Sequence, residues 1–122
     1  MGKTILIVED EILLQDVYKM VLNSQGYQVY TASNGAEGLK KLQETNPDMV
    51  LLDLFMPVLD GKEFLRNIDM SDYPHTKIVV FTNHSDSETE AEMLELGAHK
   101  YVLKSSMAPQ DLLVMAAEMT NH

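Results

Sequence analysis

Five polar residues at the ends of four apolar segments have types that suit the handling of a phosphoryl group: Glu9, Asp10, Asp53, Thr82 and Lys104. Three carboxylates brought close together repel one another, so they either hold a proton or bind a cation. Oxygen ligands in a chain without cysteine favour a hard ion, Mg²⁺ before Ca²⁺ or Zn²⁺. Thr82 and Lys104 would add a hydroxyl donor and a positive charge for the phosphoryl oxygens. The nucleophile in such a set is a carboxylate, and its product is an acyl phosphate.

The apolar segments before these residues predict strands that are buried on both faces, as in a parallel sheet covered by helices. Strands are expected over residues 3–8, 28–31, 49–52, 77–82 and 99–103. Helices are expected over residues 12–25, 35–45, 62–70, 86–96 and 109–119. This alternation indicates a single α/β domain, residues 1–122, with a parallel sheet and right-handed crossovers. Spacing alone does not give the strand order.

The first two helices carry apolar residues that we expect to face the sheet. In the first helix they are Leu13, Leu14, Val17, Met20 and Val21, and in the second they are Ala36, Leu39 and Leu42. Gly26 is expected to cap the end of the first helix.

Parallel strands end on one rim of their sheet, and ligands of open α/β sheets bind outside the carboxyl ends of the strands. This fold would therefore bring the five polar residues together. Each of them also has an ordinary explanation, because acids favour turns, threonine suits strands and lysine is a common surface charge. Asp53 taken alone fits the turn explanation better, and only the joint arrangement favours a site.

The composition argues against several classes of function. The chain has 122 residues, 45% of them hydrophobic and 23% charged, which is the balance of a soluble globular protein. With 19 acidic and 9 basic residues the net charge is −10, which disfavours direct binding to nucleic acid or to an anionic membrane. No apolar run approaches the roughly 20 residues that cross a bilayer, and the N-terminal run is too short for a signal peptide. A cytoplasmic location is the default expectation.

Four segments at matching spacings carry a resemblance to a known family: residues 5–11 (ILIVEDE), 51–57 (LLDLFMP) with Asp60-Gly61, 80–82 (VFT) and 101–104 (YVLK). Through them the chain resembles the receiver domain of two-component response regulators over essentially its whole length. The resemblance implies a flavodoxin-like (βα)5 three-layer sandwich with the strand order 2-1-3-4-5. It also implies a phosphorylation-dependent signalling switch, not a conventional enzyme, which catalyses only its own phosphorylation and dephosphorylation.

The same resemblance implies roles for individual residues. Asp53 would accept a phosphoryl group from a histidine kinase or a phosphotransfer protein in a Mg²⁺-dependent reaction. Asp10, Asp53 and the backbone carbonyl of Phe55 would bind the Mg²⁺, and Glu9 would lie just behind them. Lys104 would pair with the phosphoryl oxygens.

Two switch residues follow from the resemblance. Thr82 would swing toward the phosphate, and Tyr101 would turn inward behind it, although ordinary strand packing also explains Tyr101. Their motion would remodel the face formed by the fourth helix, fifth strand and fifth helix, where an effector protein or effector domain would bind. The fourth helix holds five acidic residues and no Lys or Arg, so pairing with its own copy is unfavourable and a monomer is expected.

Three features depart from the family pattern. Ser105 follows Lys104 where proline is usual, which puts the expected cis peptide bond in question. Asn83 replaces a customary small residue. Phe55 and His84 are bulky and flank the entrance to the phosphate, so they affect how fast water reaches the acyl phosphate.

Three other functions fit the sequence less well. A phosphatase of the haloacid dehalogenase type needs a second acid two residues after its nucleophile, and that position is Phe55. A dinucleotide-binding enzyme needs glycines after the first strand, where this chain has Glu9, Asp10 and Glu11. A degenerate receiver that serves only for docking is disfavoured because the acids, Thr82 and Lys104 are intact.

Overall fold

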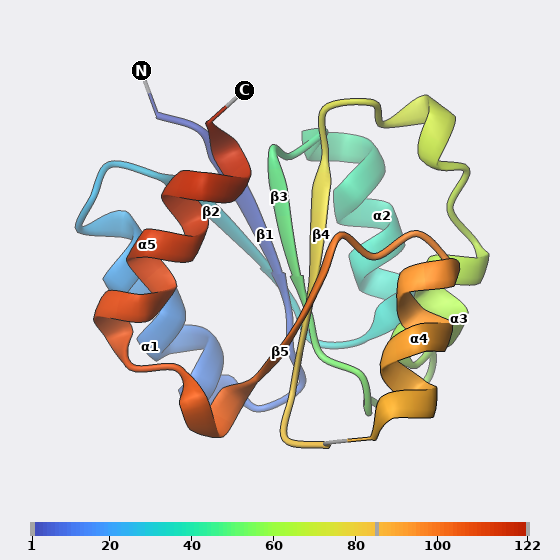
Figure 1. The fold of residues 1–122 in the computed structure, drawn as a ribbon. Helices are drawn as coiled ribbons and strands as arrows, with labels where there is room; N and C mark the ends of the chain where they lie inside the picture. The colour runs from blue at the N-terminus through green and yellow to red at the C-terminus, as the bar shows by residue number, and fades with distance from the viewer. Residues whose placement is uncertain (1, 85, 122) are drawn as a thin grey trace.

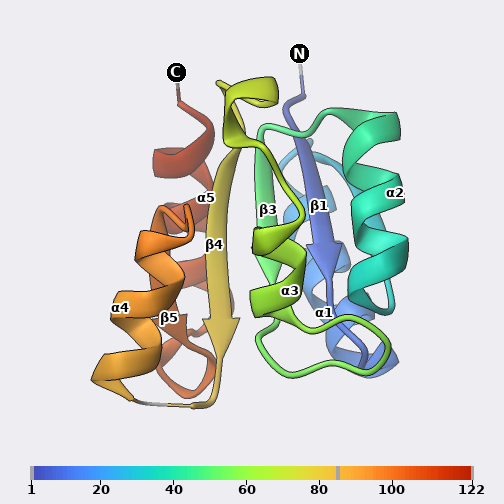
Figure 2. The same ribbon diagram turned by 90° about the vertical axis from the view of Figure 1, so that its right-hand side faces the viewer.

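The computed structural model describes residues 2–84 and 86–121, in which five parallel strands form one sheet. The strands are β1 (Thr4–Val8), β2 (Gln28–Ala32), β3 (Met49–Leu52), β4 (Lys77–Thr82) and β5 (Lys100–Leu103). Their order is β2-β1-β3-β4-β5, and the arrowheads of β1 and β4 point the same way in Figure 2. The expected flavodoxin-like order is therefore confirmed.

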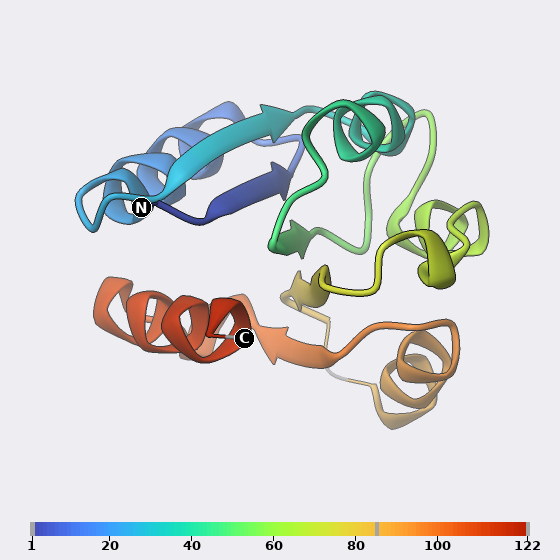
Figure 3. The same ribbon diagram turned by 90° about the horizontal axis from the view of Figure 1, so that it is seen from above.

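Helices cover both faces of this sheet and complete three layers (Figures 1 and 3). One face is covered by α1 (Ile12–Asn23) and α5 (Pro109–Thr120). The other face is covered by α2 (Gly35–Thr45), α3 (Gly61–Arg66) and α4 (Ser87–Glu95). Two short 3-10 helices, η1 (Met70–Asp72) and η2 (Lys104–Ser106), follow α3 and β5.

Each side of the sheet has its own hydrophobic core, because successive side chains of a strand point to opposite faces. In β1, Ile5 and Ile7 pack toward α1 and α5, whereas Leu6 and Val8 pack toward α2 and α3. The inner strands are thus buried on both faces, as their continuous apolar runs predict.

The expected inner face of α1 is only partly right: Val21 packs against the core and Leu14 is half-buried, but the other three residues are exposed. Leu13 is 80% exposed and Met20 is 70% exposed, while the buried residues of this helix are Gln15 and Leu22. A helical apolar stripe identifies a face but does not say whether the sheet or the solvent meets it. Here Val17 is also exposed, so α1 presents an unpartnered apolar face to solvent.

Other differences are local. Ala36 is exposed, and the sheet instead meets Gly38, where a Cβ would lie 2.9 Å from Val8 Cγ1. Helix α1 ends at Asn23 with Ser24 as its cap, so Gly26 lies beyond the cap at φ +88°. Helix α3 ends at Arg66 with Asn67 as its cap, earlier than residue 70, which instead begins η1.

Candidate functional site

The strand register brings the candidate residues to one rim. Val8 pairs with Leu52, and Leu52 pairs with Val80, so Glu9 and Asp53 stand at the same level just beyond their strands. The backbone N–H of Asp53 donates to the carbonyl of Val8 at 2.9 Å, which continues the ladder past the end of β3. Parallel pairing alone therefore places the two acids side by side.

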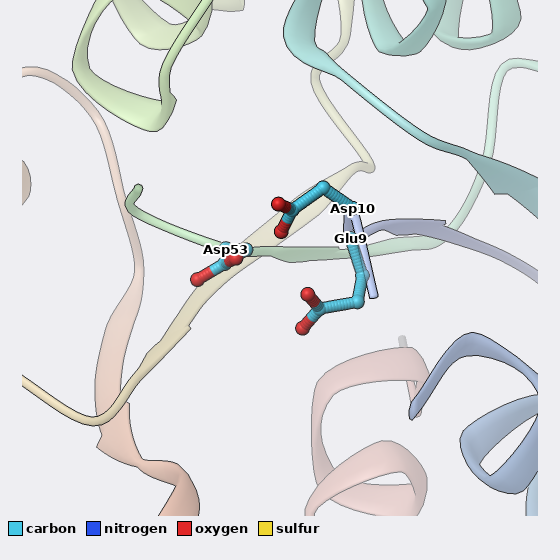
Figure 4. Close-up of side chains that lie close together, drawn as sticks. All are labelled: Glu9, Asp10 and Asp53. Carbon is cyan, nitrogen blue, oxygen red and sulfur yellow. The ribbon is translucent and has the colours of Figure 1, made fainter. Parts of the chain in front are cut away.

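Three carboxylates share this rim (Figure 4). Glu9, Asp10 and Asp53 each offer an oxygen that lies within 4.8 Å of the others. Glu9 is 2% exposed and Asp53 is 8% exposed, whereas Asp10 is the most accessible of the three. Buried carboxylates at this separation repel, and three hard oxygen donors are the set that a divalent cation such as Mg²⁺ accepts.

Lys104 supplies the positive charge at the rim, but it binds Glu9 more closely than Asp53. Its Nζ lies 2.5 Å from Glu9 Oε1 and 3.5 Å from Asp53 Oδ1. The other oxygen of Glu9 accepts the backbone N–H of Glu11 at 3.1 Å. Burial lowers the pKa of Lys104, but the hydrogen bond to Glu9 and the charge of Asp53 outweigh it, so the pKa lies above its usual value.

Asp53 is hard to ionise in this setting. Burial away from water, followed by the charge of Glu9, raises the pKa of Asp53 to about 7, and the opposing effect of Lys104 does not cancel them. A cation between the carboxylates would favour the ionised form. The burial and separation of the acids therefore fit the bound metal that the family resemblance implies.

Thr82 and Tyr101 both bind the backbone of His84. The Oγ1 of Thr82, which is buried at the end of β4, accepts the His84 N–H at 3.1 Å. The Tyr101 hydroxyl donates to the His84 carbonyl at 2.6 Å. The segment after β4 is thus held from two sides, and the inward turn of Tyr101 stays a prediction.

The loop after β3 is fixed against the site by Gly61. Its N–H donates to the Leu54 carbonyl at 2.9 Å, and a Cβ at this position would lie 2.7 Å from the Asp53 carbonyl oxygen. Within the loop, Leu59 N–H donates to the Pro57 carbonyl at 2.8 Å, which forces Val58 to φ 71°. A left-handed conformation is strained for a β-branched residue.

Phe55 and His84 stand at the entrance, as predicted. Their rings meet edge to face with centroids 5.3 Å apart. An open cavity of about 390 Å³ lies beside them, lined by Asp10, Glu11, Asp53, Phe55, Thr82, Asn83, His84 and Lys104. Metal binding by the Phe55 carbonyl stays a prediction. No cis peptide bond occurs in the part of the chain that the structure describes, and this includes the bond after Lys104.

The Glu9–Lys104 ion pair was not expected from the sequence. A glutamate has one methylene more than an aspartate, and this reach is the only signal in the sequence that could have indicated the contact. Sequence reasoning also missed Gln15, a buried amide on α1 whose contacts lie just behind the acids.

The family model for the response regulator receiver domain matches residues 5–117. Among curated proteins, sporulation initiation phosphotransferase F of Bacillus subtilis is 33% identical over 104 residues, covering 85% of this chain and 83% of that protein. The transcriptional regulatory protein AfsQ1 of Streptomyces coelicolor is 36% identical over 101 residues, covering 83% of this chain but only 44% of that protein. The chain thus spans less than half the length of AfsQ1, and the same holds for DctR of Priestia megaterium at 45%.

Solved structures that superimpose on this chain include proteins of the same receiver type. The chemotaxis protein CheY4 of Vibrio cholerae superimposes with a TM-score of 0.89 at 31% identity, covering 98% of this chain and 99% of that one. A CheY-like receiver domain from Methanospirillum hungatei superimposes with a TM-score of 0.91 at 30% identity, covering 99% and 95%.

The chain belongs to the response regulator receiver domain family. It is a phosphoacceptor signalling domain of the two-component type. Within residues 2–84 and 86–121 we find no helix long and apolar enough to cross a membrane.

Proposed function

We propose that Asp53 is the residue that accepts the phosphoryl group. One observation carries this assignment: among the described carboxylates, Asp53 both lines the open cavity and has an oxygen 3.5 Å from Lys104 Nζ. Glu9 is closer to Lys104, but both of its oxygens are engaged and its side chain is buried. Asp53 is therefore accessible from the cavity and lies beside the positive charge of Lys104, which can stabilise the incoming phosphoryl group.

The transfer needs an ionised nucleophile. An Asp53 oxygen attacks the phosphorus of a phosphohistidine donor, the new O–P bond forms as the N–P bond breaks, and the imidazole leaves with the electron pair and takes up a proton. Mg²⁺ held by Asp10, Asp53 and the Phe55 carbonyl would neutralise charge on the phosphoryl oxygens, with Glu9 behind these ligands. Because the pKa of Asp53 is about 7 without a cation, the acid cluster alone leaves it partly protonated at neutral pH.

Two residues must change partners when the phosphoryl group arrives. Lys104 exchanges its Glu9 contact for a phosphoryl oxygen, which its 3.5 Å separation from Asp53 permits. Thr82 accepts a hydrogen bond from His84, so its own hydroxyl proton remains to be donated to a phosphoryl oxygen. Movement of Thr82 would loosen the His84 backbone, which Tyr101 also holds.

Mass spectrometry after incubation with acetyl phosphate and Mg²⁺ tests the assignment. The wild-type domain should gain one phosphoryl group that is labile to hydroxylamine, and Asp53→Asn should gain none. Asp16→Asn, which changes an exposed aspartate on α1, is the matched control and should be labelled like wild type. A label that survives Asp53→Asn, or a stable adduct on Ser or Thr, refutes the assignment.

The donor is a histidine kinase or a phosphotransfer protein, and we infer that it meets the apolar face of α1. Ile12 and Leu13 begin this helix directly after the acids, and their exposed side chains continue along the helix to Met20. A protein that delivers a phosphoryl group to Asp53 must cover this rim. Contiguous exposed apolar surface is typical of protein–protein contacts.

We further propose that the phosphorylated domain stays monomeric and binds an effector with a basic patch through α4, β5 and α5. Helix α4 and its cap carry five acids: Asp86, Glu88, Glu90, Glu92 and Glu95. Of these, Glu92 pairs with Lys62 of α3, which leaves the helix strongly negative. Sedimentation of the beryllofluoride-bound domain at low and moderate salt tests the proposal, and a tight dimer built on this face contradicts it.

A further inference from the structure

Helix α1 buries a polar side chain where a packed helix normally buries an apolar one. Gln15 is 6% exposed and faces the sheet, while the apolar residues around it, such as Leu13, face solvent. A buried amide has to be hydrogen-bonded to offset the loss of water. Its partners therefore indicate why the helix carries it.

The Gln15 amide joins the ends of two strands. Its Nε2 donates to the carbonyl of Glu9, and also lies 3.2 Å from the carbonyl of Ala32 and 3.2 Å from Ser33 Oγ. Carbonyl oxygens only accept hydrogen bonds, so the side-chain nitrogen has to be the atom that faces them. The amide thus crosslinks the residue after β1 to the last residue of β2.

This crosslink fixes the peptide group that leads into Asp10. The Glu9 N–H donates to the Ala32 carbonyl at 2.9 Å, and the Glu9 carbonyl accepts from Gln15, so both backbone groups of Glu9 are held. The Glu9 side chain is occupied elsewhere, with Lys104 and the Glu11 N–H. The direction of the Asp10 side chain therefore depends on the backbone that Gln15 holds.

We propose that Gln15 is a positioning residue for the acid cluster: it orients the Glu9–Asp10 peptide so that Asp10 faces Asp53 and can share a divalent cation with it. The inference rests on the proposed function, because Asp10 and Asp53 are metal ligands only in that proposal. Gln15 touches neither the cation nor the phosphoryl group. Groups that orient metal ligands in this way typically change metal affinity by about 10–100-fold when they are removed.

Two substitutions separate positioning from charge and from packing. Gln15→Met keeps the length of the side chain and removes its donors. Gln15→Glu keeps the shape but turns a carboxylate oxygen toward the Glu9 and Ala32 carbonyls, which repels them. Charge alone would make Gln15→Glu bind a cation more tightly, whereas lost positioning makes it bind more weakly.

Thr120→Val provides the matched control. Thr120 is buried and its hydroxyl donates to the Ala116 carbonyl at 2.7 Å, so valine likewise removes a buried side-chain donor to a backbone carbonyl. Thr120 ends α5 and shares a hollow with Gly2 and Lys3, which precede β1, so it lies at the opposite end of the sheet from the acids that follow the strands. Figure 1 shows the end of α5 near the start of β1. A general loss of stability should appear in this variant without a change in metal affinity.

The measurement is a Mg²⁺ titration of the unphosphorylated domain at about pH 8. Binding is monitored through the NMR chemical shifts of the backbone amides of Asp10 and Asp53. Folding of every variant is checked by circular dichroism. Both Gln15 variants should bind Mg²⁺ about tenfold more weakly or worse, and Thr120→Val should bind like wild type. Gln15→Asn, which withdraws the amide by one methylene group, replaces Gln15→Met if that variant does not fold.

The possible failures are distinct. Folded Gln15 variants that bind Mg²⁺ like wild type, or a Gln15→Glu variant that binds it more tightly, overturn the positioning role and leave the metal site standing. A wild-type domain whose amides do not respond to Mg²⁺ overturns the metal site and the inference together.

Discussion

Asp53→Asn should stabilise the metal-free domain at neutral and alkaline pH. The pKa of Asp53 is raised from 3.8 to about 7, chiefly by burial and then by Glu9. Between these two values the folded state binds more protons than the unfolded chain. Stability of the wild type is therefore lost as the pH rises through this window. Asparagine has no proton to lose, so the variant escapes this loss.

The size of the effect follows from the shift. Each pH unit inside the window is worth about 1.4 kcal/mol. From pH 5 to pH 7 the folded state keeps its proton while most of the unfolded chain has lost it. The free energy of unfolding of Asp53→Asn, measured relative to that of wild type, should thus increase by at most about 3 kcal/mol from pH 5 to pH 7. The gain should level off above pH 7, where both states of the wild type are ionised.

Urea unfolding in the presence of a chelator, at several values from pH 5 to pH 8, measures the difference between the two proteins. Titration of the histidines is common to both and largely cancels. Asp16→Asn, at an exposed position of α1, is the control for removing one negative charge from an acidic protein. A difference between Asp53→Asn and wild type that stays flat, or that shrinks as the pH rises, refutes the assigned cost of the buried carboxylate.

Mg²⁺ at ten times its dissociation constant should raise the free energy of unfolding by about 1.4 kcal/mol, less in Asp10→Asn; a urea curve unmoved by Mg²⁺ contradicts the metal site. The phosphorylated Phe55→Ala, His84→Ala double variant should lose its phosphate faster than wild type, because the two rings meet at the entrance. Mass spectrometry over time measures the loss. Longer retention in the double variant means that the two rings do not shield the acyl phosphate. Val58→Gly should stabilise the fold by about 1 kcal/mol, since the φ of 71° is relieved and the side chain is exposed. Val58→Ala keeps the strain and is its control, so equal urea midpoints for the two variants refute the strain.

The sheet and its rim could be predicted from the sequence because a strand buried on both faces consists of an unbroken run of apolar residues. Val50 to Leu52 and Ile78 to Phe81 are such runs, and parallel pairing then fixes where Asp53 and Thr82 stand. The direction of a helix face could not be predicted in this way. In α1 the apolar stripe around Leu13 meets solvent, and the sheet is met by Leu22 and by Gln15.

The ion pairs and hydrogen bonds within the site also could not be predicted from the sequence. Spacing places Lys104 near three acids but does not say which of them it binds, because this depends on the length of each side chain and on what else holds it. The choice of Glu9 follows from its reach and from the Glu11 N–H that fixes its other oxygen. The two hydrogen bonds to His84 depend on loop geometry that no local sequence pattern specifies.

Because the Glu9 carboxylate contacts Lys104, it competes with external anions for this lysine. A phosphate-like ligand that takes Lys104 Nζ from the Glu9 carboxylate would bind with an apparent affinity reduced by the fraction of molecules in which the lysine is free. A cation that draws on the same acids weakens the hold of Glu9 on the lysine and raises this fraction. Linkage is reciprocal, so the anion tightens the cation to the same extent. If both ions bind as proposed, the rim would respond weakly to either ion alone and strongly to both together, and would thus register their simultaneous presence.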